Sequence, residues 1–232
     1  MQKAVVFWSG GKDSAMALYR AMNHPELEIT GLVTVLNADS GTSSVHQLPE
    51  PLIEKQAAEI GIPLLKMLVS SAPSNQEYEA ALLQTYRQLQ SEGINTVIYG
   101  DIFLADIRVY RENLAAKAGI RVLFPLWQIP SPILMDGFID SGFNAITCCI
   151  DSSKLEERFL GRFLNREFID DLPEEIDPAG ENGEFHTFCF QGPIFKQAIN
   201  FDTGARQSSY RGLSADAQTP GQQFMYLDLC LK

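Results

Sequence analysis

A short segment near the N-terminus combines glycines, hydroxyls, a lysine and an acid in an order suited to binding phosphate. This phosphate loop consists of Ser9, Gly10, Gly11, Lys12, Asp13 and Ser14. The two glycines let the backbone adopt positive φ and approach a ligand closely. Lys12 offers a point charge for phosphate oxygens, and Asp13 offers a hard oxygen ligand for Mg²⁺. We therefore predict that all six residues bind a nucleotide and that Asp13 also binds the metal.

The residues on either side favour the same function. The apolar run of residues 4–8 is typical of a buried parallel strand, and residues 15–19 have the spacing of a helix. A strand, a glycine turn and a helix start leave backbone amides pointing at an anion. The spacing differs from a Walker loop, which has four residues between its first glycine and Gly-Lys. It resembles the pyrophosphate loop of the ATP pyrophosphatases, which cleave ATP between the α and β phosphates.

Strands and helices alternate through the first half of the chain. Apolar runs at 29–36, 63–69, 96–99 and 122–124 predict strands, and residues 49–60, 75–92 and 103–118 predict helices. Five short buried strands separated by helices predict an α/β fold, a Rossmann-like parallel twisted sheet with helices on both faces. Ligands of such sheets bind beyond the carboxyl ends of the strands. The phosphate loop, the polar residues 37–47 and Gly100-Asp101 are therefore expected to meet in one crevice.

Three prolines, Pro125, Pro130 and Pro132, predict a boundary between two parts of the chain. We expect an ATP-binding domain at 1–127 and a smaller α/β substrate-binding domain at 128–232. The second part has predicted helices at 133–141 and, with breaks, at 154–171, and predicted strands at 145–150, 187–190 and 224–231. Composition predicts a loop at 172–184 and a mobile connection at 205–222.

The net charge of −11, from 18 basic and 29 acidic residues, argues against nucleic acid as a partner. The chain lacks a signal-peptide pattern and an apolar run of the ~20 residues that span a bilayer, so we expect no membrane association and a cytoplasmic location.

The four cysteines form no C-x-x-C pair, which argues against a zinc knuckle or a dithiol centre. Adjacent Cys148 and Cys149 are expected in a buried strand. The oligomeric state stays open, a homodimer included.

A second dense stretch of polar side chains spans residues 180–187. It contains Glu181, Asn182, Glu184, His186 and Thr187 around two glycines. The glycines permit an irregular backbone that can direct several of these groups into one pocket. A carboxylate or the imidazole could act as a general base there. A solvated acidic turn capped by the threonine is the structural alternative.

The sequence DPAGENGEFHTF at residues 177–188, the signature segment, is followed by GPIF at 192–195. Together they resemble the signature of the diphthine–ammonia ligase family, a branch of the ATP pyrophosphatases. Resemblance extends to residues 56–64, to 100–102 with Arg108 and Glu112, and to 125–127, 161–162 and 171–173, so that it covers residues 1–201. The family's second arginine after Asp101 falls at position 110, which is Tyr110 here with Arg111 beside it.

The resemblance implies an AMP-forming amide ligase that uses ATP and Mg²⁺. A substrate carboxylate attacks the α-phosphate, pyrophosphate leaves, and ammonia then displaces AMP from the acyl-adenylate. It implies catalytic roles for Lys12, Asp13, Asp101, Glu181 and Glu184, and substrate binding by Asn182, His186, Thr187 and Arg108. One of the two glutamates would capture ammonium, and the sequence does not distinguish them. For Asp101, an N-cap before a helix at Ile102 is the structural alternative.

The acceptor implied by the family is diphthine on a translation elongation factor. A bacterial ATP pyrophosphatase of the same fold, acting on a small metabolite in cobalamin salvage, is the closest alternative. A sensor that holds ATP without turnover is a third hypothesis, although Lys12 and Asp13 argue against it. A transfer-RNA thiolase is disfavoured by the net charge and by the cysteine spacing.

Overall fold

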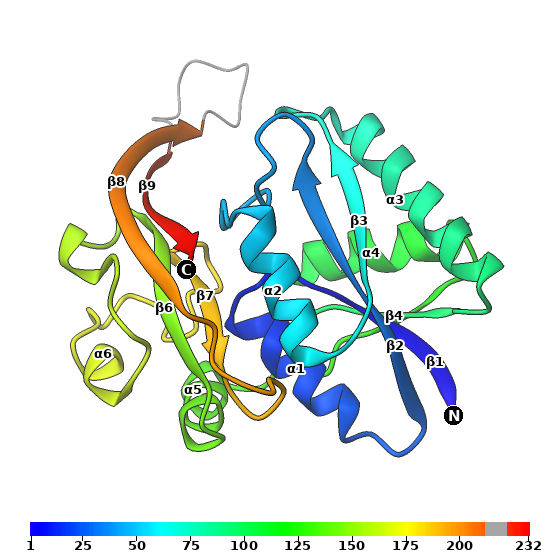
Figure 1. The fold of residues 1–232 in the computed structure, drawn as a ribbon, viewed down its shortest axis with the longest axis horizontal. Helices are drawn as coiled ribbons and strands as arrows, with labels where there is room; N and C mark the ends of the chain where they lie inside the picture. The colour runs from blue at the N-terminus through cyan, green and yellow to red at the C-terminus, as the bar shows by residue number, and fades with distance from the viewer. Residues whose placement is uncertain (212–221) are drawn as a thin grey trace.

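The computed structural model describes residues 1–211 and 222–232. Its first sheet has five strands: β1 (Gln2–Phe7), β2 (Leu27–Asn37), β3 (Leu64–Val69), β4 (Thr96–Ile98) and β5 (Arg121–Leu123). The strands are parallel and run in the order β3-β2-β1-β4-β5. Helices α1 (Lys12–Met22) and α2 (Glu50–Ile60) cover one face, and α3 (Asn75–Ser91) and α4 (Ala105–Lys117) cover the other (Figure 1). The predicted parallel sheet with helices on both faces is confirmed.

Residues 4–7 of the central strand β1 are apolar and buried because both faces of the strand are covered. In β1, Ala4 and Val6 pack with side chains of α1 and α2, whereas Val5 and Phe7 pack with side chains of α3 and α4. Successive residues of a strand point to opposite faces, so a strand covered on both sides needs apolar residues at every position. The continuous apolar run at residues 4–8 is therefore explained by the helices that cover both faces of the sheet.

Local capping chemistry accounts for the start of α3 and the end of α2. Before α3, the Ser74 hydroxyl accepts a hydrogen bond from the Glu77 backbone N–H, and the Glu77 carboxylate accepts one from the Ser74 N–H. This reciprocal pair satisfies two amides that the first helical turn leaves unbonded. Helix α2 ends at Gly61, whose φ of 81° is readily adopted by glycine.

The second sheet has four antiparallel strands in the order β7-β6-β9-β8 (Figure 1). They are β6 (Asn144–Asp151), β7 (Phe185–Gln191), β8 (Phe201–Arg211) and β9 (Gln222–Leu231). Helix α5 (Ser131–Asp140) precedes this sheet, and the 3₁₀ turn η1 (Glu157–Phe159) and the short helix α6 (Arg166–Asp170) lie between β6 and β7 in sequence. The smaller C-terminal α/β part is confirmed.

Two sequence predictions for this part are wrong. The broken helix at 154–171 is reduced to η1 and α6, because tertiary packing of the buried Phe159 and Phe168 holds the segment in turns. The mobile connection at 205–222 is ordered strand up to residue 211, and residues 212–221 lie outside the described part. Strand β8 is polar because it lies at the edge of its sheet, where one face meets water.

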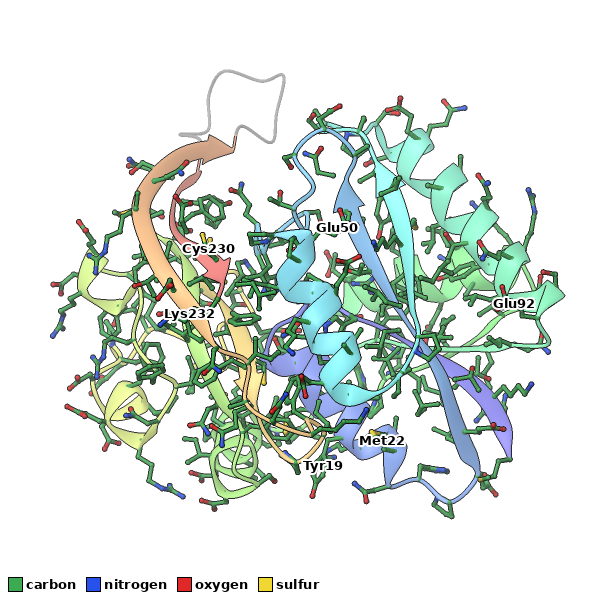
Figure 2. The ribbon with its side chains drawn as sticks, viewed as in Figure 1. Tyr19, Met22, Glu50, Glu92, Cys230 and Lys232 are labelled. Carbon is green, nitrogen blue, oxygen red and sulfur yellow. The ribbon has the colours of Figure 1, made fainter. Side chains whose placement is uncertain are left out.

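Helices α1 and α2 lie between the two sheets (Figure 1) and join them through one hydrophobic core. Trp8 after β1 belongs to the same buried cluster as Phe185 and Phe188 of β7. At the end of α1, Tyr19, labelled in Figure 2, packs edge-on against Phe143 with 5.6 Å between ring centroids. Apolar side chains therefore pack the two sheets together.

Cys148 and Cys149 are buried in β6, as the apolar pattern around them predicts. Within residues 1–211 and 222–232, no helix combines the length and the apolar character that crossing a bilayer requires.

Candidate active site

The phosphate loop is fixed by strand β7 of the second sheet. The backbone N–H of Cys189 donates to the Gly10 carbonyl (2.9 Å), and the N–H of Lys12 donates to Thr187 Oγ1 (3.1 Å). Gly10 has a φ of +85°, and a Cβ at this position would lie 2.6 Å from Leu48 Cδ1. Glycine is therefore required here both for the backbone conformation and for the close packing.

A buried amide on α2 reinforces the loop. Gln56 is fully buried, and its Nε2 donates to the carbonyl oxygens of Gly10 (2.9 Å) and Cys189 (2.7 Å). Its Oε1 accepts from Trp8 Nε1 (2.8 Å). One side chain thus joins the end of β1, the phosphate loop and β7, and each of its polar atoms has a partner, as burial requires.

A cavity of about 410 Å³, the first cavity, opens beyond the carboxyl ends of β1 and β4. The strand order changes direction between these two strands, and ligands of open α/β sheets bind at such a point. Its lining includes Ser9, Asp13 and Ser14 after β1, Ser43 to His46 after β2, and Gly100 and Asp101 after β4. The predicted convergence of three loops on one crevice is confirmed.

Lys12 and Asp13 form an ion pair at the edge of this cavity, with 2.9 Å between Nζ and Oδ2. The Lys12 side chain is almost fully buried, and its ammonium lies 5.4 Å from the centre of the Phe185 ring. Burial raises the pKa of Asp13, and the charge of Lys12 opposes this shift. Asp13 Oδ1 is buried without a hydrogen-bond partner. This oxygen can therefore serve a ligand in the cavity.

Asp101 is held against the cavity wall by Arg111. The guanidinium lies 2.7 Å from Asp101 through Nε and 3.2 Å through Nη2, and it stacks over the Tyr99 ring at 4.0 Å. A planar guanidinium paired through two nitrogens fixes both the position and the orientation of a carboxylate. Helix α4 begins at Ala105 with Leu104 as its N-cap, so Asp101 as a helix cap is wrong.

Glu181, from the signature segment, lines the same cavity as Asp13 and Asp101. Its Oε1 accepts hydrogen bonds from the backbone N–H of Ile102 (2.8 Å) and Phe103 (3.3 Å). Burial raises the pKa of Glu181 to about 7 and the charge of Asp13 adds to the shift, against the two hydrogen bonds that lower it. A carboxyl group with a pKa near neutrality can both accept and donate a proton at physiological pH.

Two histidines form another wall of this cavity. His186 of the signature segment and His46 of the loop after β2 have ring centroids 4.9 Å apart. His46 Nδ1 lies 2.8 Å from the carbonyl oxygen of Thr187. The structure therefore brings His186 to the cavity, as its predicted role in binding substrate requires.

Seven predicted residues are absent from the described lining of the first cavity: Gly10, Gly11, Lys12, Arg108, Asn182, Glu184 and Thr187. Asn182 and Glu184 line a second cavity. The hydroxyl of buried Thr187 is engaged by the phosphate loop. Arg108 stacks over the Trp127 ring at 4.6 Å and pairs with Glu112 at 2.8 Å.

Comparison with known proteins shows the family to which this chain belongs. The sequence profile of the diphthamide synthase N-terminal domain matches residues 2–122, and that of the diphthamide synthase C-terminal domain matches residues 131–215. The chain belongs to the diphthamide synthase family. The family resemblance drawn from the phosphate loop and the signature segment is confirmed.

Individual relatives of this diphthamide synthase family member are distant. A Danio rerio protein named diphthine–ammonia ligase is 26% identical over 215 residues, which cover 84% of each chain. A Homo sapiens protein of the same name is 25% identical over an alignment of 245 positions, which covers 97% of this chain and 90% of that one. A crystal structure of a predicted tRNA methyltransferase subunit from Methanocaldococcus jannaschii aligns at 17% identity with a TM-score of 0.39, over 68% of this chain and 82% of that one.

Two residues of this diphthamide synthase site had no assigned role in the sequence. Gln56 lies in an amphipathic helix, where a glutamine is typical of the solvent face. Arg111 was visible only as the neighbour of Tyr110, and the structure shows that Arg111 makes the ion pair with Asp101. The sequence signal for the role of Gln56 is that a polar residue stands at a position that the helical pattern places on the buried face.

Replacing Glu181 with glutamine is expected to change how stability depends on pH. The folded-state pKa of about 7 exceeds the unfolded value of 4.5, so folding favours the protonated form. The stability that Glu181 contributes is fully present below about pH 4.5 and is lost as pH rises through about 7. Urea unfolding of wild type and Glu181→Gln between pH 4 and pH 8 should show a smaller decline in the variant. Glu92→Gln, at the exposed end of α3 (Figure 2), should decline as wild type does.

Proposed function

We propose that this chain is an ATP-dependent ligase that adenylates the carboxylate of diphthine on an elongation factor and replaces AMP with ammonia. The observation that carries the proposal is that Glu181 of the signature segment lines one cavity with Asp13 and Asp101 of the nucleotide loops. A ligase needs its nucleotide and its acceptor in one place, because binding both reactants makes their reaction intramolecular. The names of the relatives supply the acceptor.

The first cavity suits a nucleotide whose phosphates face the start of α1. Backbone amides at a helix N-terminus attract anions, and Lys12 would neutralise charge on the departing pyrophosphate. Val33 and Val35 of β2 also line the cavity, together with Thr34, whose buried Oγ1 has no hydrogen-bond partner. An apolar wall with one unsatisfied hydroxyl fits a planar base that carries hydrogen-bonding edges.

The acidic residues fit a magnesium ion shared with the phosphates. Asp13 Oδ1 is buried and without a hydrogen-bond partner, and Asp101 lines the same cavity. Among the described residues, no three His, Cys, Asp or Glu side chains converge to hold a metal alone. Mg²⁺ is usually bound by one or two carboxylates together with substrate phosphates and water. Such an ion would stabilise the charge that develops on pyrophosphate as it leaves.

Glu181 is placed for the amidation step. Nitrogen that attacks the acyl-adenylate carries a surplus proton, and a carboxylate with a pKa near 7 can take it. The hydrogen bonds from Ile102 and Phe103 hold one oxygen of Glu181. The second oxygen is then left for the reacting nitrogen. Of the two candidate bases in the signature segment, we therefore assign this role to Glu181.

The test is the fate of α-labelled ATP incubated with Mg²⁺ and ammonium, with and without an elongation factor that bears diphthine. We expect AMP only when the factor is present, with one amide formed per AMP. AMP formed only with a pool of small metabolites would instead favour a metabolite ligase. Intact ATP under every condition would favour a sensor and contradict the proposal.

A further inference from the structure

A second cavity, also of about 410 Å³, lies at the junction of β6, β7 and the signature segment. Its lining includes Ser153 and Lys154 after β6, Glu175 and Ile176, and Asn182 and Glu184 of the signature segment. The signature segment thus contributes Glu181 to the first cavity and Glu184 to the second. None of the steps assigned above uses the second cavity.

Two buried acids occupy opposite positions of the strand pair beside this cavity, and one of them, Glu184, lines it. Strands β6 and β7 are antiparallel with Ile150 opposite Phe185, and the Asp151 N–H donates to the Glu184 carbonyl (2.9 Å). Asp151 is therefore opposite Glu184, and opposite residues carry their side chains on one face of the sheet. Asp151 is 0% exposed and Glu184 is 2% exposed. Like charges in this arrangement repel each other unless a cation or a proton lies with them.

Each carboxylate has one satisfied and one unsatisfied oxygen. Asp151 Oδ1 accepts from Ser153 N (3.0 Å) and Oγ (2.6 Å), and Glu184 Oε1 accepts from Asn182 Nδ2 (3.0 Å) and Asp177 N (3.3 Å). Asp151 Oδ2 and Glu184 Oε2 are buried without a hydrogen-bond partner. Buried unsatisfied acceptors are rare in folded proteins and indicate a missing donor.

The charge near these two oxygens is not balanced. Lys154 Nζ is 3.9 Å from Asp151 Oδ2, and it donates its hydrogen bond to the Asn182 carbonyl (2.8 Å) instead. Lys154 therefore offsets at most one of the two buried carboxylates, and Asp177 adds a third acid nearby. A small cation that donates hydrogen bonds would satisfy both the charge and the two acceptors.

We infer that the ammonium ion that supplies the nitrogen of the product binds at the second cavity, against the free oxygen of Glu184, which lines it, and that of the buried Asp151 beside it. The inference rests on the proposed ligase function and assigns its nitrogen donor a site apart from the nucleotide. Ammonium donates up to four hydrogen bonds, so it can bridge both free carboxylate oxygens.

Asp177 connects this site with the first cavity. Its N–H donates to Glu184 Oε1 (3.3 Å), and its Oδ1 accepts from the N–H of Glu181 (3.3 Å). Its charge also contributes to the raised pKa of Asp13. The ammonium site and the adenylation site thus share one wall, built from residues 177–184, with Glu181 on the nucleotide side.

The first test measures ammonium binding without any other substrate. Thermal unfolding is followed in rising ammonium chloride, with sodium and potassium chloride at equal ionic strength as references. We expect the melting temperature to rise in ammonium beyond either reference, because a ligand that binds the folded state stabilises it. Glu184→Gln and Asp151→Asn should abolish this excess, whereas Glu175→Gln, an exposed acid at the same cavity, should keep it. An equal rise of the melting temperature in potassium chloride, or no excess in ammonium chloride for wild type, would overturn the assignment. This outcome does not depend on whether the variants fold.

The second test measures steady-state kinetics with the diphthine-bearing factor as acceptor. Loss of one charge-assisted hydrogen bond should raise the KM for ammonium about 10- to 100-fold in Glu184→Gln, with the KM for ATP unchanged. An unchanged KM for ammonium in a folded, active variant would remove the ammonium site and leave the ligase standing. Absence of AMP from wild type would instead remove the ligase, and the thermal measurement would still decide on ammonium binding.

Discussion

Replacing Lys12 with methionine is expected to lower the rate of AMP formation by about 100- to 1000-fold, the effect typical of removing one preorganised electrostatic group. Methionine keeps the apolar stem that packs near Phe185 and removes only the ammonium. The loss follows because charge that builds on the departing pyrophosphate then has no lysine partner in the phosphate loop. Labelled AMP is measured at saturating acceptor, at a temperature well below the melting point of the variant.

Stability must be separated from chemistry in this variant. Removing Lys12 leaves the Asp13 carboxylate without its counter-ion, so the melting temperature should fall as well. Adding Asp13→Asn removes the uncompensated charge and should recover stability without recovering activity. Lys117→Met, whose side chain is 59% exposed, serves as the matched control and should match wild type in both measurements. Activity within a few-fold of wild type in Lys12→Met would exclude the lysine from the mechanism.

Replacing Gln56 with leucine is expected to destabilise the protein by about 3–5 kcal/mol, because three buried partners lose a hydrogen bond, each worth about 1–1.5 kcal/mol. Those partners are Trp8 Nε1 and the carbonyl oxygens of Gly10 and Cys189. The leucine also releases the phosphate loop, so the KM for ATP should rise. Urea unfolding gives the free energy, and initial rates of AMP formation give the KM.

Gln90→Leu is the matched control for this substitution. Gln90 is partly buried and donates one hydrogen bond, to the Ala118 carbonyl (2.6 Å), far in sequence from the phosphate loop. Its loss should lower stability by about 1 kcal/mol and leave the KM for ATP unchanged. A similar small effect of Gln56→Leu on both quantities would show that the buried amide does not organise the loop.

The first sheet could be predicted from the sequence because its physics is local. A strand buried on both faces must be apolar at every position. A glycine turn between such a strand and a helix is typical of a phosphate-binding loop. Strand β8 could not be predicted in this way, because a polar edge strand owes its structure to pairing with β9. The same holds for the segment around Phe159 and Phe168, whose turns depend on contacts between residues distant in sequence.

The residues of the candidate site also divide into those that the sequence could predict and those that depend on contacts between distant parts of the chain. Residue types pointed to Lys12 and Asp13 for phosphate and magnesium binding, and the position of Asp101 after a strand predicted that it lies at the same crevice. The sequence could not assign different roles to Glu181 and Glu184, since both lie in one short segment that contains two glycines. Their difference comes from partners far away in the chain: Glu181 meets the amides after β4, whereas Glu184 faces Asp151 at the end of β6.

The hydrogen bonds from β7 to the phosphate loop make the two halves of the site thermodynamically dependent on each other. Thr187 and Cys189 hold Lys12 and Gly10, and the neighbouring His186 lines the wall where an acceptor would lie. If an acceptor that docks against His186 changes the affinity for ATP, ATP must change the affinity for the acceptor by the same factor. Strand β7 would then carry this coupling, because it contacts the phosphate loop through Thr187 and Cys189 and the cavity wall through His186.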